Sequence, residues 1–523
     1  MLIAAAMALA GASPHATADA RRVETGIITD AVPDADGVRS FRGIPFAAPP
    51  VGALRWRAPQ RAMPWQGERS ADQFGPKCMQ TARLGNIDPL NPRMSEDCLY
   101  LNIWTPAKSA DDRLPVMVWI YGGSFNVGAG SEPWYNGTNL ARKGVIVVTL
   151  NYRLDVFGFL AHPELTAESE RHASGNFGLL DQIAALGWVK RNIAAFGGDS
   201  GRITIFGESA GSLSVSALMA SPLGRGLFQR AIGQSGATLY ADKSPFALPP
   251  LAKAEQAGMK FAKILSTYSI GELREKPAEV LLEAAAKNPE VPRMVRGPII
   301  DGLVLPANAV KIFAQGQQND VALLAGSNAD EGTLFAARVQ PRATPDSFTD
   351  QVRKVFGDAA ASILKVYPAG TPDQATSSFA ALLGDQLISY PTWKWTELQA
   401  TTGKAPTYRY LFALRPPAPT LSLTPLAAPG VFHSAEIPYV FDNLQVRDWP
   451  WRPEDRRMAR ILSSYWTNFA RRGDPNGADL PNWPVYRGPD GTVMRLAAEP
   501  DAGSDPGVER YTVLDQFYFG RAQ

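Results

Sequence analysis

A serine in the motif GESAG, at residues 207–211, is the strongest candidate for a nucleophile in this chain. The motif has the form G-x-S-x-G, follows the β-branched run Ile203–Phe206 and opens a stretch of small apolar residues. A nucleophile held at a sharp strand-to-helix turn needs flanking residues without bulk, which Gly207 and Gly211 provide. The start of the following helix directs free N–H groups toward the reacting centre. We therefore interpret Ser209 as the nucleophile of an acyl-transfer site rather than as part of an ordinary Gly/Ser turn.

A serine hydroxyl needs a base to become a nucleophile at neutral pH, and that base is usually histidine. The chain has four histidines: His15, His162, His172 and His433. In a strand–turn–helix hydrolase the catalytic residues follow one another in the order serine, acid, histidine. Because His433 alone follows Ser209, it is the predicted base, and the alternative is a structural histidine in the core.

The acid that orients the base should lie between these two residues. Asp330 and Glu331 follow a strand-like run, Val321–Ala325, so their carboxylates are expected at the carboxyl end of a strand, where α/β sheets bind ligands. Asp301 and Asp385 are competing candidates. The spacing does not choose between Asp330 and Glu331.

An acyl-transfer site also needs backbone N–H donors for the oxyanion that forms on the carbonyl. The segment YGGSF, residues 121–125, follows the strand-like run Val116–Tyr121. Its glycines let the backbone approach a substrate closely. Together with Ala210, which follows the nucleophile, this loop is predicted to supply three such groups.

The rest of the pattern predicts an α/β fold that places these residues. The apolar runs 116–121, 145–150, 203–206 and 321–325 are typical of strands in a parallel sheet covered on both faces. Helical periodicity is expected over residues 178–196, 209–220, 252–287 and 458–471. The alternation of strands and helices indicates a mostly parallel central sheet flanked by helices. Five prolines between Leu414 and Gly430 predict a long stiff loop.

The composition excludes several classes of protein. Of 523 residues, 45% are hydrophobic and 10% aromatic, enough for a large core and against global disorder. The net charge of +2 argues against a generic polyanion binder, so no nucleic-acid partner is expected. Two cysteines do not make a Cys₄ zinc site.

The N-terminus is interpreted as a secretory signal. Residues 1–20 combine a short apolar run with a small-x-small site ending at Ala20, although no Lys or Arg precedes the run. The alternative is an Ala-rich tail. No run long enough to span a membrane follows. The expected location is therefore secreted or periplasmic.

Cys78 and Cys98 are the two cysteines of the chain. In an exported protein such a pair is expected to form a disulfide that closes a loop of about 20 residues. The alternative is two buried free thiols.

Beyond these patterns, the chain resembles the type-B carboxylesterases, the esterase–cholinesterase family, from Val23 to Leu514. The resemblance rests on segments that occur in order along the sequence: FRGIPF at 41–46, SEDCLYLN at 95–102, WIYGG at 119–123, NYR at 151–153, FGGD at 196–199, GESAG at 207–211, GQSG at 233–236, DEG at 330–332, and His433 followed by EIPY at 436–439. It implies an α/β-hydrolase domain over residues 21–523 and a serine esterase that requires no cofactor or metal.

The resemblance also implies roles that spacing leaves open. Glu331 becomes the acid of a Ser209–Glu331–His433 triad, and Gly123, Ser124 and Ala210 become the oxyanion donors. A Cys78–Cys98 disulfide is implied as well, together with ion pairs between Arg42 and Glu96 and between Arg153 and Asp181. Many relatives carry a third glycine where this chain has Ser124. The serine should keep the backbone N–H donor, but its side chain should narrow the space around that donor.

Three other functions compete with hydrolysis of a small or medium carboxylic ester. One is a non-catalytic binding protein of the same fold. Another is cleavage of an amide, carbonate, thioester or lactone, which the same triad could perform. The third is a choline-ester specialist, for which Trp134, Tyr135 and Trp393 are candidate walls of an aromatic cage. The favoured alternative for these three residues is ordinary packing in the core. The natural ester and the oligomeric state do not follow from the sequence.

Overall fold

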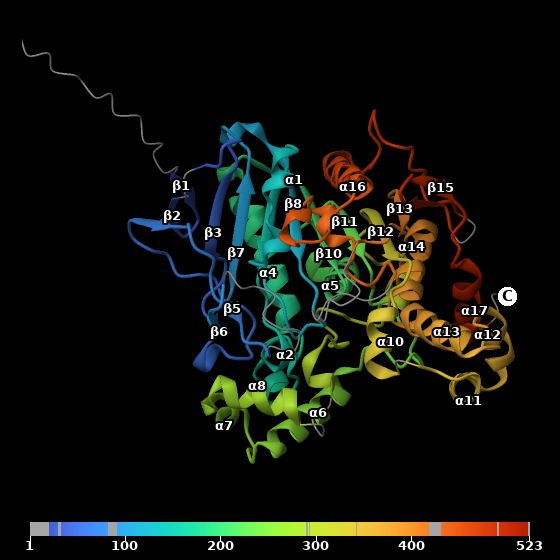
Figure 1. The fold of residues 1–523 in the computed structure, drawn as a ribbon. Coiled ribbons are helices and arrows are strands. Elements are labelled where there is room, and N and C mark those ends of the chain that lie inside the picture. Colours follow the sequence, from blue (N-terminus) through green and yellow to red (C-terminus); the bar gives the residue numbers. More distant parts are fainter. Residues whose placement is uncertain are drawn as a thin grey trace, which may run out of the picture.

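A ten-stranded mixed sheet forms the centre of the protein in the computed structural model, which describes residues 20–29, 33–81, 91–288, 291, 293–340, 342–417, 430–488 and 491–520 (Figure 1). Its strand order is β15-β14-β13-β12-β11-β10-β8-β9-β7-β3. The strands from β14 to β9 run parallel, whereas β15, β7 and β3 pair in antiparallel fashion at the two edges. The sheet strands are β3 (Arg39–Pro45), β7 (Tyr100–Thr105), β8 (Leu114–Ile120), β9 (Ile146–Leu150), β10 (Gly198–Glu208), β11 (Arg230–Gln234), β12 (Ala322–Asn328), β13 (Thr407–Phe412), β14 (Val493–Leu496) and β15 (Asp501–Gly503).

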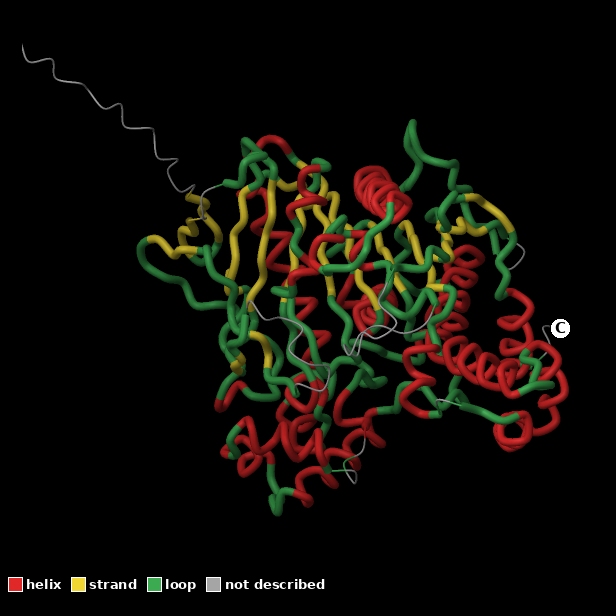
Figure 2. The backbone as a smooth tube through the Cα atoms, viewed as in Figure 1, coloured by secondary structure: helices red, strands yellow, loops and turns green. Residues whose placement is uncertain are grey.

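Helices cover both faces of this sheet (Figure 2). On one face α5 packs against β10 and β11, and α14 packs against β12 and β13; on the other, α16 packs against β8 and β10. All four predicted strands and the predicted helices are present, as the apolar runs and the 3.6-residue periodicity indicated. The helices of this central part of the molecule are α1 (Thr138–Arg142), α2 (Asp155–Phe159), α3 (Pro163–Glu168), α4 (Phe177–Asn192), α5 (Ala210–Ala220), α9 (Ala309–Ala314), α14 (Tyr390–Thr402), α15 (Ile437–Val440) and α16 (Pro453–Arg472).

Two helical groups extend beyond the sheet (Figure 1). One has its own apolar core under α2, and the other packs around α14; both lie at the side of the sheet where the nucleophile motif ends β10. Their members are α6 (Leu251–Ile264), α7 (Ile270–Glu275) and α8 (Ala278–Lys287) in the first, and α10 (Thr333–Val339), α11 (Pro345–Phe356), α12 (Ala360–Val366), α13 (Pro372–Gly384) and α17 (Val508–Phe519) in the second. Small strands complete the N-terminal part: β1 (Ala20–Val23), β2 (Gly26–Thr29), β4 (Glu68–Ser70), β5 (Lys77–Cys78) and β6 (Met94–Ser95).

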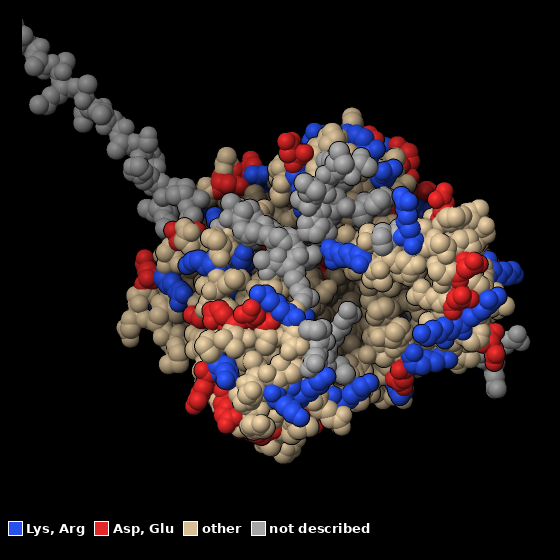
Figure 3. All heavy atoms as spheres, turned by 60° about the horizontal axis from the view of Figure 1, so that its bottom comes forward, with Lys and Arg blue, Asp and Glu red and all other residues tan. Residues whose placement is uncertain are grey.

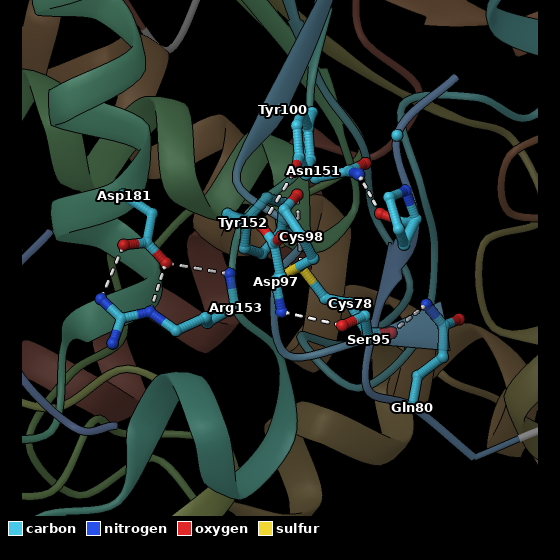
Figure 4. The surroundings of a disulfide bond; sticks show 12 residues. Cys78, Gln80, Ser95, Asp97, Cys98, Tyr100, Asn151, Tyr152, Arg153 and Asp181 are labelled. Atoms are coloured by element: carbon cyan, nitrogen blue, oxygen red, sulfur yellow. Dashed lines mark hydrogen bonds and ion pairs between the residues drawn. A yellow bond between two sulfur atoms is a disulfide. The ribbon is translucent and has the colours of Figure 1, made fainter. Parts of the chain in front are cut away.

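The two cysteines form the predicted disulfide, with their Cα atoms 4.9 Å apart (Figure 4). The predicted pair of Arg153 and Asp181 is also present and fully buried, with Nη2 and Oδ1 2.7 Å apart. Cys78 and Cys98 join the segment around β5 to the start of β7, so the cross-link ties the N-terminal region to the edge of the main sheet.

The predicted pairing of Arg42 with Glu96 is wrong. Glu96 instead binds Arg55 through two contacts, at 2.6 and 2.7 Å. Arg55 is favoured over Arg42 because its Nη1 also donates to the carbonyls of Leu273, Arg274 and Lys276. Each of its three guanidinium nitrogens therefore has a hydrogen-bond partner at this site. Arg42 lies over the ring of Phe74, at 5.2 Å.

Two sequence predictions lie largely or wholly outside the described residues. These are the signal at residues 1–20, of which Ala20 alone is described, and the proline-rich loop, of which residues 418–429 are not described. Within the described ranges, no helix combines the length and apolar character that a membrane span requires.

Candidate active site

Ser209 lies at the turn between β10 and α5 in a strained backbone conformation, with φ 56° and ψ −122°. Such a φ is rare for a residue with a side chain and is held here by the surrounding packing. A Cβ on Gly211 would lie 1.9 Å from the carbonyl oxygen of Ile120, and one on Gly207 would lie 2.6 Å from the same atom. The two glycines therefore let the turn pack directly against the end of β8, as their absence of bulk predicted.

The side chains of Ser209, His433 and Glu331 meet in one chain of contacts. His433 Nε2 is 2.8 Å from Ser209 Oγ, and His433 Nδ1 is 2.6 Å from Glu331 Oε2. The other carboxylate oxygen of Glu331 accepts the N–H of Asn328 at 2.6 Å. His433 and Glu331 are both buried, whereas Ser209 is partly exposed.

The competing residues have other partners. Asp330 accepts the N–H of Val431 at 2.7 Å and so holds the segment that carries His433. Asp301 caps the turn at residues 303–305, and Asp385 pairs with Arg510. His162 accepts the N–H of Glu164 at the start of α3, and His172 is exposed; both lie away from the nucleophile.

A second carboxylate, that of Glu208, lies beside the imidazole. Its Oε1 is 3.2 Å from His433 Nε2, the atom that also contacts Ser209. Burial raises the pKa of Glu208 well above its usual range, against the attraction of His433. Burial alone would lower the pKa of His433, but Glu208, Glu331 and Glu436 outweigh it and raise that pKa to about 9.

Glu436 is a buried carboxylate that the sequence patterns left without a role. It accepts N–H groups from Asn328 at 2.7 Å and Gln234 at 3.0 Å, and Gln234 in turn accepts from Trp466 on α16 at 3.0 Å. Burial and the nearby Glu331 raise the pKa of Glu436. Asn328 contacts both Glu436 and Glu331, so this network supports the surroundings of Glu331. In the sequence, only the position of Glu436 in EIPY, three residues after His433, could have indicated it.

The loop after β8 lies against the nucleophile. A Cβ on Gly122 would lie 3.0 Å from Ser209 Cβ, so the backbone passes directly over the serine. Ser124, where many relatives have glycine, has φ 55°. Within the described residues, the N–H groups of Gly123, Ser124 and Ala210 donate to no hydrogen-bond acceptor, although all three flank Ser209.

A cleft of about 110 Å³, open to solvent, leads to Ser209 and His433. Figure 3 shows a hollow near the middle of the face that carries the helices beyond the sheet, with Lys and Arg side chains near its rim. The walls of the cleft are mostly apolar and aromatic, and include Val127, Trp134, Tyr135, Leu334, Phe335, Arg338, Phe432, Ile437, Pro438 and Trp449. Of the three aromatic residues that the sequence offered either as cleft walls or as core packing, Trp134 and Tyr135 line the cleft. Trp393 packs in the core against Tyr511 of α17.

Three of the missed wall residues, Leu334, Phe335 and Arg338, lie on α10 directly after Glu331, at a spacing that puts one face of the helix on the cleft. The ring of Phe335 is 5.1 Å from that of His433. Within the described part of the chain, no group of three or more His, Cys, Asp or Glu side chains is arranged to hold a metal ion.

A parallel sheet with a serine at the turn after β10, an acid after β12 and a histidine in a later loop defines an α/β-hydrolase. The carboxylesterase family profile matches residues 23–513, and the chain belongs to that family. It is 36% identical to the fumonisin B1 esterase of Sphingopyxis macrogoltabida over 491 residues, which cover 90% of this chain and 85% of that protein. It is also 36% identical to the para-nitrobenzyl esterase of Bacillus subtilis strain 168 over 496 residues, covering 91% and 94% of the two chains.

Solved structures agree with this assignment. A thermophilic PNB esterase superposes with a TM-score of 0.81 at 34% identity, covering 95% of this chain and all of that one. The family and fold predicted from the sequence are therefore confirmed, and the protein is a carboxylic ester hydrolase.

Proposed function

We propose that Ser209, His433 and Glu331 form the catalytic triad of a serine carboxylesterase acting on small to medium esters. The observation that carries this proposal is the continuous contact from Ser209 Oγ through both ring nitrogens of His433 to Glu331, at 2.8 and 2.6 Å. Ser209 attacks the ester carbonyl while His433 Nε2 accepts its proton, and Glu331 orients the ring and stabilises its cation. The alcohol leaves with the proton from His433, and water then hydrolyses the acyl-enzyme.

In this mechanism the N–H groups of Gly123, Ser124 and Ala210 hold the oxyanion. Support comes from their place around Ser209 and from the absence, within the described residues, of any other acceptor for them. Donors fixed before the reaction stabilise developing charge without reorganisation, which is usually the largest catalytic contribution in acyl transfer.

The Ser209→Ala variant tests the proposal. Removing the nucleophile should lower kcat on 4-nitrophenyl butyrate by several orders of magnitude, because the triad residues act as a unit. The matched control is Ser200→Ala on the same strand β10; among the described residues only the backbone carbonyl of Ser200 accepts a side-chain hydrogen bond, from Lys190, and this group is kept. Circular dichroism checks that both variants fold. Retention of most of the activity by folded Ser209→Ala would contradict the proposed triad.

We also propose that residues 21–523 form one hydrolase domain that is exported to a secreted or periplasmic location after loss of residues 1–20. The disulfide supports an oxidising compartment, since such bonds persist there and are rare in the cytosol. The central sheet supports one domain, because its strands come from Arg39 to Gly503.

A further inference from the structure

A cation that belongs to the chain lies against two aromatic residues of the cleft wall. The guanidinium carbon of Arg447 lies 4.0 Å from the centre of the Trp134 ring and 5.6 Å from that of Trp449. Both tryptophans line the cleft that leads to Ser209. A guanidinium this close to an aromatic face is attracted by the negative face of the ring.

Arg447 is held there by packing and by the attraction of the Glu132 carboxylate rather than by a hydrogen bond. Its side chain is partly buried, and within the described residues its guanidinium makes no hydrogen bond or ion pair. The two segments that it joins are fastened independently, because Asn443 Nδ2 donates to the carbonyls of Trp134 at 2.8 Å and Asn136 at 2.9 Å. The arginine therefore stays against Trp134 whenever these segments are together.

Without Arg447, this end of the cleft would suit a cationic ligand. Trp134 and Trp449 offer aromatic faces, and the buried carboxylates of Glu132 and Glu208 line the same cleft. Aromatic faces near carboxylates are the features that bind quaternary ammonium groups. With Arg447 in place, one face of Trp134 is covered and a positive charge meets any cation that approaches. Arg338 on α10 adds a second positive side chain to the wall.

We propose that Arg447 is a specificity-determining residue that makes this cleft select neutral or anionic esters over cationic ones. The inference rests on the proposed function, since it concerns esters cleaved at Ser209. One face of the ring that could hold a choline-type substrate is covered by the protein's own cation, whose positive charge lies at the cleft wall.

A matched pair of esters tests the proposal. Acetylcholine and 3,3-dimethylbutyl acetate have nearly the same shape, but a charged nitrogen in the first is a neutral carbon in the second. The unmodified enzyme should favour the neutral ester in kcat/KM by about tenfold or more, as expected for a nearby like charge and a covered ring. In Arg447→Met this ratio should fall by about tenfold, whereas Arg447→Lys, which keeps the charge, should retain most of it.

The control is Arg353→Met on α11, which removes the same charge from an exposed position, 68% accessible, that is not part of the cleft wall. Its ratio should match that of the unmodified enzyme. An unchanged ratio in folded Arg447→Met, or an equal fall in Arg353→Met, would overturn the proposal. Should the Met variant not fold, Arg447→Gln gives the same comparison.

A second measurement requires no variant. Tetramethylammonium should fail to inhibit hydrolysis of the neutral ester by the unmodified enzyme at concentrations matched for ionic strength with NaCl. Competitive inhibition there would also overturn the proposal. Failure of the proposed function gives a different result, namely full hydrolysis of the neutral ester by Ser209→Ala.

Discussion

At the scale of single residues, His433 lies beside two carboxylates, of which only Glu331 is its hydrogen-bond partner. Glu331 contacts Nδ1, while Glu208 lies 3.2 Å from Nε2, on the side of the nucleophile. The two carboxylates differ in consequence. Glu331 orients the ring, whereas Glu208 adds attraction for the imidazolium that forms when Ser209 gives up its proton. Glu208 is thus placed to act through His433, as a positioning residue with an electrostatic effect.

Replacing Glu208 by Gln should move the acidic limb of the pH profile to lower pH. The proton on His433 must be absent for Ser209 to be activated, so kcat/KM rises with pH through the pKa of His433, which the surrounding carboxylates raise to about 9. After burial, which lowers that pKa, Glu208 is the largest influence and raises it, so loss of its charge lowers the pKa. The measurement is kcat/KM against pH for a neutral ester.

The control for this prediction is Glu279→Gln, an exposed carboxylate on α8, which should leave the limb in place. If the acidic limb of the profile is unchanged or moves to higher pH in Glu208→Gln, Glu208 does not raise the pKa of His433. A merely structural role would lower activity without this displacement.

At the scale of elements, the reactive turn depends on how closely β8, β10 and α5 approach one another. β10 pairs with β8 in parallel register, Gly207 opposite Ile120, and α5 packs beneath both strands. The carbonyl end of β8 therefore presses against the first turn of α5. No side chain fits between them, and this contact positions the loop at residues 122–124 over Ser209.

Gly211→Ala should consequently destabilise the protein. The new methyl group would start 1.9 Å from the Ile120 carbonyl oxygen, and both atoms belong to rigid backbone. Overpacking of this kind costs about 3 kcal/mol of unfolding free energy, or more. Chemical unfolding in urea, followed by tryptophan fluorescence, measures the change.

Gly297→Ala is the comparison, because a Cβ there meets no atom within 4 Å. Its unfolding free energy should change by no more than about 0.5 kcal/mol. Equal stability of the two variants would mean that the turn can move away from β8, and that its close packing does not hold Ser209 in its strained conformation.

At the scale of the whole molecule, long-range connections hold together parts that the chain separates widely. The disulfide fastens the N-terminal segment to β7, while Arg55 binds Glu96 and the end of α7 at once. The segment that carries His433 is fastened to β12 through Asp330 and to the loop bearing Trp134 through Asn443. The site is thus assembled from four distant stretches of sequence.

Removing the cross-link should weaken the fold without removing the site. The double variant Cys78→Ser/Cys98→Ser should lose about 3 kcal/mol of unfolding free energy, the chain-entropy value for a loop of this length. Urea unfolding under non-reducing conditions measures it, with the unmodified protein in dithiothreitol as the comparison. Thiol titration of the denatured, unreduced protein should find no free thiol; two free thiols would contradict both the bridge and the proposed export.

Much of this architecture was predictable because the relevant signals are local. Four strands were visible as short β-branched runs, since a strand buried on both faces must be apolar throughout. Ser209 was visible because the turn tolerates only small neighbours. His433 was singled out by the scarcity of histidine and by chain order. Each of these depends on residues close together or on simple order along the chain.

The predictions that were wrong, and the questions that the sequence left open, depend on distances between residues that are far apart in the chain. Arg42 and Arg55 are 54 and 41 residues before Glu96, so the sequence does not show which of them reaches it. The position of α7 decides this, because its end supplies further acceptors for Arg55. Trp393 looked as suitable for a cleft wall as Trp134, but α14 turns it into the core. The wall residues of α10 carry no signature of their own beyond their spacing after Glu331.

The sequence by itself indicated the family, four of the central strands, and the candidate nucleophile and base, because those follow from residue type, local pattern and order along the chain. The tertiary structure shows that Glu331 and not Asp330 contacts His433, which spacing left open and only the family resemblance implied, and that Arg447 covers one face of the Trp134 ring. Both decisions depend on side chains from segments about 100 and 300 residues apart meeting within about 4 Å, and contacts at such separation are fixed only when the whole core packs.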